Sequence, residues 1–198
     1  MAKQYEQPDY WSKKAFAEGY PARSVYKLEQ LNEKFGIFKQ AKTVLDLGAA
    51  PGSWTTYALH LLPLDGLCVS VDLKPLDSQL KDTRLRFFQG DMYEKSIFTE
   101  VKKNGPYDVV ICDAAPATTG NKTVDASRSV ALVELACAYA VENTRVGGNF
   151  VVKIFQDGSQ QEILQNLKKK FNRAQAFKPK ASRSSSFETF LVGLGFLG

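Results

Sequence analysis

Residues 44–54 read Val44-Leu45-Asp46-Leu47-Gly48-Ala49-Ala50-Pro51-Gly52-Ser53-Trp54, and this stretch is the strongest indication of the fold class. It has the pattern of a buried β-strand that carries an acidic residue near its end and runs into a tight Gly/Ala/Pro turn before a helix. Open α/β sheets bind ligands at the carboxyl ends of their strands. Glycine and alanine at such a turn let the backbone approach a ligand closely. The stretch therefore predicts a cofactor loop.

The spacing of the glycines narrows the class of cofactor. Three residues separate Gly48 from Gly52, so the dinucleotide motif G-x-G-x-x-G is absent, and the chain has no G-x-x-x-x-G-K-[ST] phosphate loop. This spacing disfavours a nicotinamide dehydrogenase. It favours a nucleoside cofactor without a pyrophosphate, of which S-adenosyl-L-methionine is the commonest.

The bulk composition is that of one α/β domain. The chain has 198 residues, of which 44% are hydrophobic and 24% are charged. We expect an N-terminal helical extension over residues 1–40 and a Rossmann-like core over residues 41–198. The start of the chain lacks the apolar segment of a signal peptide, and no run of 18 apolar residues occurs. These features predict a cytoplasmic protein without a membrane segment.

Cysteine and histidine usage restricts the chemistry. Cys68, Cys112 and Cys137 lack C-x-x-C spacing, which is typical of buried free thiols. His60 is the only histidine, so we expect neither a His-based metal site nor a Ser-His-Asp triad. A general acid or base must then be Lys, Asp, Glu or Tyr. The net charge of +5 permits a nucleic-acid partner without establishing one, since a solvated basic face is the more ordinary interpretation.

Apolar runs that are typical of strands alternate along the chain with segments whose apolar residues have helical spacing. Strands are predicted at 43–48, 67–73, 85–90, 107–112, 149–155, 174–178 and 187–196. Helices are predicted over 9–36, after residue 52, over 127–146, and after Ser159, which begins a capping box with Glu162. The alternation predicts a Rossmann-like α/β fold with a mostly parallel seven-stranded sheet and helices on both faces.

Acidic residues follow or end four of the predicted strands: Asp46, Asp72, Asp91 and Asp113. Any one of them alone would suit a turn or a helix cap. Their recurrence at one edge of the sheet favours a binding site. Asp72 suits a ribose diol, because a carboxylate accepts both hydroxyl hydrogens, and Asp91 suits an adenine amino group. Trp54 fits a cofactor contact and a core position equally well.

Beyond these acids, the chain resembles the FtsJ/RrmJ family of RNA ribose 2′-O-methyltransferases over nearly its whole length. The matching segments are Gly19-Tyr20, Arg23 to Leu28, Asp46 to Trp54, Gln89 to Asp91, Asp113 to Pro116, Val151 to Phe155, Lys178-Pro179 and Arg183 to Glu188. Pro21-Ala22 departs from the Arg-Ser that is frequent in the family, which removes a cation near the expected RNA.

The resemblance implies a catalytic tetrad of Lys27, Asp113, Lys153 and Glu188, in which Lys153 accepts the proton of the ribose 2′-hydroxyl. It also implies cofactor contacts at Gly52, Trp54, Asp72, Asp91 and Asp113. We add Gly48 to this set because it belongs to the same loop. A lysine acts as a base only when its pKa is lowered, and the charge of Lys27 is suited to lowering it. The structural alternative is a buried cluster of two lysines and two acids without catalysis.

The resemblance further implies a substrate. A compact chain of this type is similar to the branch that methylates a uridine of 23S ribosomal RNA in the large subunit, and we expect a monomer that acts on RNA without a metal. Related branches act on tRNA or on mRNA caps. From a different class, a non-catalytic RNA-binding protein of ribosome assembly would share the fold.

Overall fold

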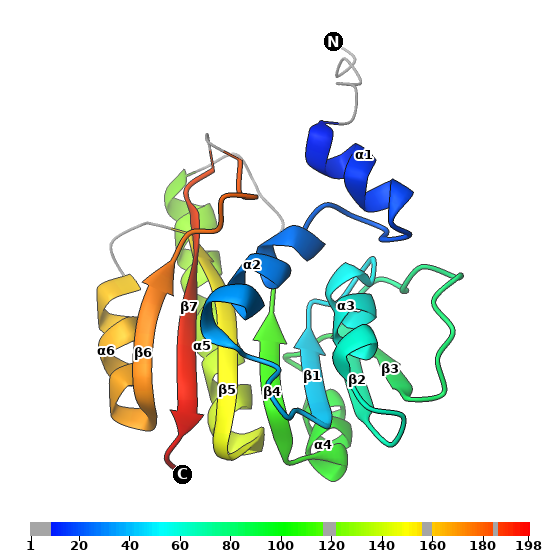
Figure 1. Cartoon of the computed structure of the whole chain (residues 1–198). Coiled ribbons are helices and arrows are strands. Elements are labelled where there is room, and N and C mark those ends of the chain that lie inside the picture. The colour runs from blue at the N-terminus through cyan, green and yellow to red at the C-terminus, as the bar shows by residue number, and fades with distance from the viewer. Residues whose placement is uncertain (1–8, 117–121, 156–159, 184–185) are drawn as a thin grey trace.

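A seven-stranded sheet forms the centre of the molecule, with the strand order β3-β2-β1-β4-β5-β7-β6 (Figure 1). The computed structural model describes residues 9–116, 122–155, 160–183 and 186–198. The strands are β1 (Thr43–Leu47), β2 (Leu67–Asp72), β3 (Leu85–Gln89), β4 (Tyr107–Cys112), β5 (Thr144–Phe155), β6 (Phe171–Phe177) and β7 (Glu188–Phe196). The helices are α1 (Tyr10–Ala17), α2 (Val25–Phe35), α3 (Ser53–Leu61), α4 (Lys95–Asn104), α5 (Lys122–Asn143) and α6 (Gln160–Lys170).

The sheet is parallel except for β7, which pairs antiparallel with both β5 and β6. β1 lies between β2 and β4 and is parallel to both. The strand order therefore reverses between β1 and β4, and such a reversal opens a crevice at the carboxyl ends of the strands. The predicted fold class is confirmed.

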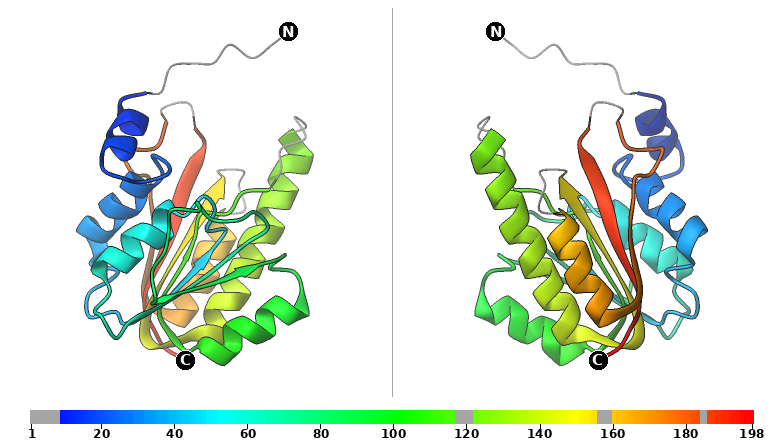
Figure 2. Two further views of the ribbon diagram at one scale, coloured as in Figure 1. Left: turned by 90° about the vertical axis from the view of Figure 1, so that its right-hand side faces the viewer. Right: turned by 90° about the vertical axis from the view of Figure 1, so that its left-hand side faces the viewer.

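Helices cover both faces of the sheet, as the edge-on views show (Figure 2). On one face α2 and α3 pack through a buried cluster that includes Leu28, Leu31 and Trp54. On the other face, the core includes Val133 and Tyr139 of α5. Because β4 is covered on both sides, every residue in it is buried, which explains why its sequence reads as a continuous apolar run.

The predicted helix over residues 9–36 is wrong as a single element. It is two helices, because α1 ends at Ala17 and the chain turns at Gly19, whose φ is +80°, before α2 begins at Val25. Pro21 in the connection cannot donate a backbone hydrogen bond to a continuous helix. The predicted stop at Gly36 is confirmed, since this residue takes the left-handed conformation with φ 64°.

Two further differences concern α4 and the junction between α5 and β5. α4 has no counterpart among the predicted elements, because it buries only Ile97 and Val101. α5 ends at Asn143 rather than at residue 146, and β5 begins directly at Thr144. Ser159, the predicted capping residue, lies outside the described residues. No helix in the described ranges is long and apolar enough to cross a membrane.

Candidate active site

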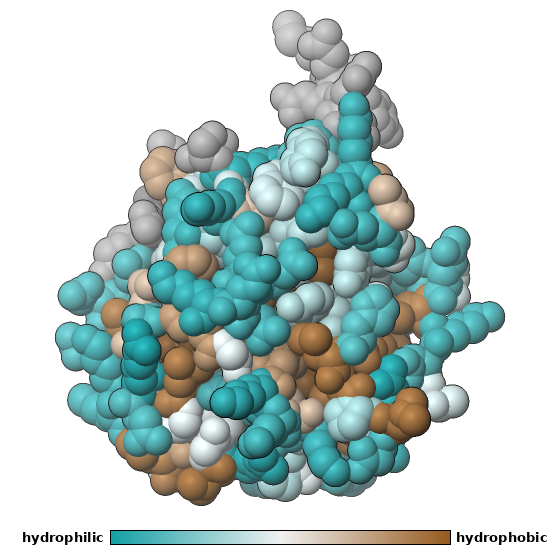
Figure 3. All heavy atoms as spheres, in the orientation of Figure 1, coloured by the Kyte–Doolittle hydropathy of each residue, from teal (hydrophilic) through white to brown (hydrophobic). Residues whose placement is uncertain are grey.

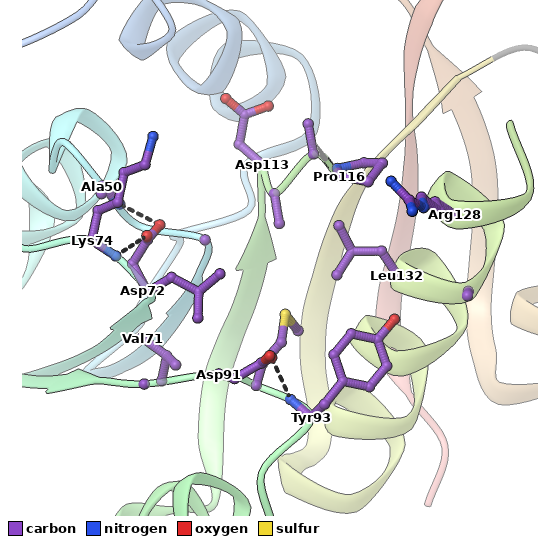
Figure 4. A pocket seen from close by; sticks show the side chains of 17 residues that line it. Ala50, Val71, Asp72, Lys74, Asp91, Tyr93, Asp113, Pro116, Arg128 and Leu132 are labelled. Carbon is purple, nitrogen blue, oxygen red and sulfur yellow. Dashed lines mark hydrogen bonds between the residues drawn. The ribbon is translucent and has the colours of Figure 1, made fainter. Parts of the chain in front are cut away.

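A cavity of about 580 Å³ lies at the crevice between the carboxyl ends of β1, β2 and β4 (Figure 4). Three of the predicted strand-end acids line it, namely Asp72, Asp91 and Asp113. Its other lining residues are Gly48, Ala50, Val71, Leu73, Lys74, Gly90, Met92, Tyr93, Ala114, Ala115, Pro116, Arg128, Ala131 and Leu132. The acids outnumber the two cations, so the cavity is suited to a ligand with positive charge and disfavours a pyrophosphate.

Asp72 is held by the backbone on two sides. One of its carboxylate oxygens accepts a hydrogen bond from the Ala50 amide at 2.9 Å, and the other accepts from the Lys74 amide at 2.8 Å (Figure 4). An ionised carboxylate has about four lone-pair sites. Each oxygen of Asp72 therefore retains acceptor capacity for one hydroxyl of a diol.

The wall opposite Asp72 contains residues that sequence reasoning missed. Met92 and Tyr93 follow Asp91, and Arg128 and Leu132 come from α5. Asp91 itself accepts from the Tyr93 amide at 3.0 Å. The sequence feature that could have indicated Met92 and Tyr93 is their position directly after Asp91. The α5 residues lie far away in sequence and reach the cavity through the fold alone.

The glycines of the loop leave room for neighbouring segments of the protein. Gly48 has φ +74°, and a Cβ there would lie 2.5 Å from the Cβ of Ala114. Its missing side chain thus gives room to the segment after β4. At Gly52, with φ +115°, a Cβ would lie 3.1 Å from the Leu80 side chain. Gly48 still lines the cavity, whereas Gly52 is not part of its lining.

Trp54 occupies the core position rather than the cavity. It is buried, its indole N–H donates to the Ser24 carbonyl at 2.9 Å, and its ring lies 5.7 Å from that of Phe190. These contacts join α3 to the start of α2 and to β7. The placement does not support the predicted cofactor contact, and it makes Trp54 a support for the neighbouring site.

The four residues of the predicted tetrad form two ion pairs. Lys153 Nζ lies 2.9 Å from Asp113 Oδ1 and donates to the Asp113 carbonyl at 2.5 Å. Lys27 Nζ lies 2.6 Å from Glu188 Oε1. At most 16% of any of these four side chains is exposed. Partly buried charges of this kind require such partners.

The register of the sheet places the two pairs near each other. Lys153 of β5 is directly opposite Phe190 of β7, and Glu188 precedes Phe190 by two residues. Since side chains alternate along a strand, all three project from the same face. Lys27 lies over the Phe190 ring at 6.0 Å. The fold therefore gathers all four residues from α2, β5, β7 and the end of β4.

The electrostatics of Glu188 link the two pairs. Burial alone would raise the pKa of Glu188, but the hydrogen bond and charge of Lys27 outweigh it, and the charge of Lys153 contributes to the lowering. The carboxylate is thus held ionised between two lysines, because both stabilise its charged form.

Asp46 lies beneath the site and does not line the cavity. It is fully buried and accepts a hydrogen bond from the Thr55 hydroxyl at 2.7 Å. Among the described residues its other oxygen has no hydrogen-bond partner. Burial is the main cause that raises the pKa of Asp46 to about 7. The Thr55 hydrogen bond opposes this rise, and the charges of Asp113 and Asp72 add to it.

Asp46→Asn is expected to alter the pH dependence of stability, because asparagine mimics the protonated acid. The folded state keeps the Asp46 proton up to about pH 7, whereas the unfolded chain releases it near pH 4. The wild-type free energy of unfolding therefore falls relative to the variant as pH rises from about 4 to about 7. Urea unfolding at pH 5, 6, 7 and 8 measures this difference. Parallel profiles for the two proteins would contradict the assignment.

The chain is similar to known proteins over nearly its whole length. The family model described as FtsJ-like methyltransferase matches residues 20–196. The ribosomal RNA large subunit methyltransferase E of Treponema denticola is 66% identical, with 100% of both chains covered. The protein of the same name from Treponema pallidum is 44% identical over 98% of this chain and 96% of its own.

Solved structures share the fold. A protein described as a ribosomal RNA methyltransferase from Plasmodium falciparum has a TM-score of 0.76 and 26% identity over 90% of this chain and 100% of its own. The O-methyltransferase TomG from Streptomyces achromogenes has a TM-score of 0.61 at 16% identity, over 100% of this chain and 92% of its own. The second likeness concerns the fold alone.

Proposed function

Because the chain belongs to the FtsJ-like methyltransferase family, we propose that it transfers the methyl group of S-adenosylmethionine to a ribose 2′-hydroxyl of large-subunit ribosomal RNA. The nucleotide we propose is a uridine of 23S ribosomal RNA, modified by a monomer in the cytoplasm. The rRNA assignment is supported by the relatives named for large-subunit methylation. The net charge of +5 is compatible with an RNA substrate.

The residues of the first cavity fit S-adenosylmethionine. When bound, this cofactor supplies a sulfonium methyl that its positive charge already activates. Asp72 would accept the hydrogens of the ribose diol, and Asp91 would accept from the adenine amino group. The excess of acids over cations in the lining suits a sulfonium.

One observation carries the choice of reaction: Asp113 lines the cofactor cavity and also pairs with Lys153. The Lys153 side chain therefore lies beside the cavity that would hold the methyl donor. In the proposed step the neutral amine form of Lys153 would take the 2′-hydroxyl proton as the 2′-oxygen bonds to the methyl carbon and the bond from that carbon to sulfur breaks. The products would be protonated Lys153, the methylated ribose and S-adenosylhomocysteine. Asp113 orients Lys153, while the Lys27–Glu188 pair faces the incoming ribose. Alignment and removal of one proton are the main requirements of this reaction.

Labelled cofactor tests the proposal. The protein and S-adenosylmethionine with a labelled methyl group are incubated in three separate reactions. These contain large ribosomal subunits, free ribosomal RNA or tRNA. We expect label in ribosomal RNA at a position resistant to alkaline cleavage, because a 2′-O-methyl group blocks attack by that oxygen. Label on a base, or exclusive labelling of tRNA, would contradict the proposal.

A further inference from the structure

A second cavity of about 430 Å³ adjoins the tetrad on the side of α2. It is lined by Arg23, Ser24, Lys27, Arg183, Ser186 and Glu188. Lys27 and Glu188 belong to the tetrad, so this cavity borders the place where the substrate ribose would lie. Hydrophilic side chains dominate the upper part of this face of the molecule, over α2 and the segment that precedes β7 (Figure 3).

The charges in this second cavity do not cancel. Three cations and one carboxylate line it, and the carboxylate of Glu188 is already paired with Lys27. Arg23 and Arg183 are the other two cations. Arg23 pairs with Asp9 outside the lining and donates to the Ala181 carbonyl at 2.6 Å, which fixes its guanidinium.

Arg183 is the cation that remains available. It is exposed, and within the described part of the chain no hydrogen bond or ion pair engages its guanidinium. Burial lowers the pKa of Arg23, and the charge of Arg183 adds to this lowering, so the two guanidinium groups repel each other. A bound anion would relieve that repulsion, and Arg presents a planar fork that matches phosphate oxygens.

We propose that this second cavity binds a backbone phosphodiester of the RNA adjacent to the methylated ribose, with Arg183 as its principal ligand and Arg23 as a fixed second cation. The inference rests on the proposed function, because it takes the ribose to lie at the tetrad. A ribose delivered to Lys153 necessarily carries flanking phosphates with it. Contacts to phosphate position a nucleic acid without reading its sequence.

Arg183→Gln tests the inference. Large ribosomal subunits with unmethylated RNA serve as the substrate, and KM, kcat and the salt dependence of RNA binding are measured. We expect KM for RNA to rise about tenfold, as loss of one charge-assisted hydrogen bond implies, with kcat within about twofold. The slope of log Kd against log salt should become shallower by about 0.7 to 0.9, because one phosphate contact is lost.

Two further variants isolate the cause. Arg173→Gln removes the same charge from an exposed position of β6 that lines neither cavity, and its KM and salt slope should match the wild type. Arg183→Lys should retain the wild-type salt slope while losing part of the affinity, because a lysine cannot bind phosphate through a fork. Equal slopes for Arg183→Gln and Arg173→Gln would overturn the inference.

The outcome is separable from that of the proposed function. If the wild type fails to methylate RNA, the proposed function fails, whereas the salt slope of RNA binding still reports on the second cavity. If the wild type methylates RNA and Arg183→Gln behaves like Arg173→Gln, the proposed function stands and the phosphate site is rejected.

Discussion

Lys153→Ala should reduce methyl transfer by about a thousandfold or more, while S-adenosylhomocysteine still binds within a few-fold of the wild-type affinity. Loss of a positioned general base costs on the order of 10² to 10⁴ in rate, and the variant also leaves Asp113 without its ion-pair partner. Cofactor affinity should persist because Lys153 does not line the first cavity. Single-turnover transfer of labelled methyl groups and calorimetric binding of S-adenosylhomocysteine measure the two quantities.

Lys102→Ala provides the matched control. It also breaks a lysine–acid pair, with Nζ 3.2 Å from Glu142 Oε2, but that pair lies on the surface and 59% of the lysine side chain is exposed. We expect turnover close to that of the wild type. Near-normal turnover by Lys153→Ala as well would eliminate Lys153 as the base and favour the structural alternative for the tetrad.

Asp72→Ala should weaken binding of S-adenosylhomocysteine by about a hundredfold or more. Each hydrogen bond from a ribose hydroxyl to an ionised acceptor contributes about 1.5–3 kcal/mol, and the variant would lose the two that we propose. It also releases the Ala50 and Lys74 amides that Asp72 holds. Isothermal titration calorimetry with S-adenosylhomocysteine gives the affinity directly.

A nearby aspartate separates these effects. Asp77 is exposed and accepts from the Gln79 amide at 2.9 Å, which is the same local contact that Asp72 makes with Lys74, but it does not line the cavity. Asp77→Ala should therefore bind S-adenosylhomocysteine normally. An Asp72→Ala variant that binds as tightly as Asp77→Ala would show that Asp72 is a structural turn residue.

The sheet could be predicted because parallel strands that are covered on both faces have continuous apolar sequences. The strand-end acids could also be located, since the carboxyl ends of parallel strands meet at one edge. Helical periodicity was less informative between Asp9 and Gly36, where the apolar spacing continues through a turn. The break between α1 and α2 depends on the backbone conformation at Gly19, which the spacing of apolar residues does not indicate.

The sequence could not predict which lysine pairs with which acid, or which backbone segments lie in close contact. Nothing in the order Lys27, Asp113, Lys153, Glu188 states which lysine meets which acid. Lys153 meets Asp113 because β5 lies beside β4, and Glu188 of β7 meets Lys27 of α2. The close approach of Gly48 to Ala114 could not be predicted for a similar reason. Both residues belong to loops that meet only after β1 and β4 have paired.

The contact between Gly48 and Ala114 also limits which methyl-donor analogues the protein can use. On that side, the wall of the first cavity is two backbone segments packed together, and a Cβ at residue 48 would lie 2.7 Å from the Ala114 Cα. Trimming a side chain cannot widen such a wall. The opposite rim consists of side chains, among them Tyr93, Arg128 and Leu132. Redesign for bulkier alkyl donors would therefore have to start at that rim.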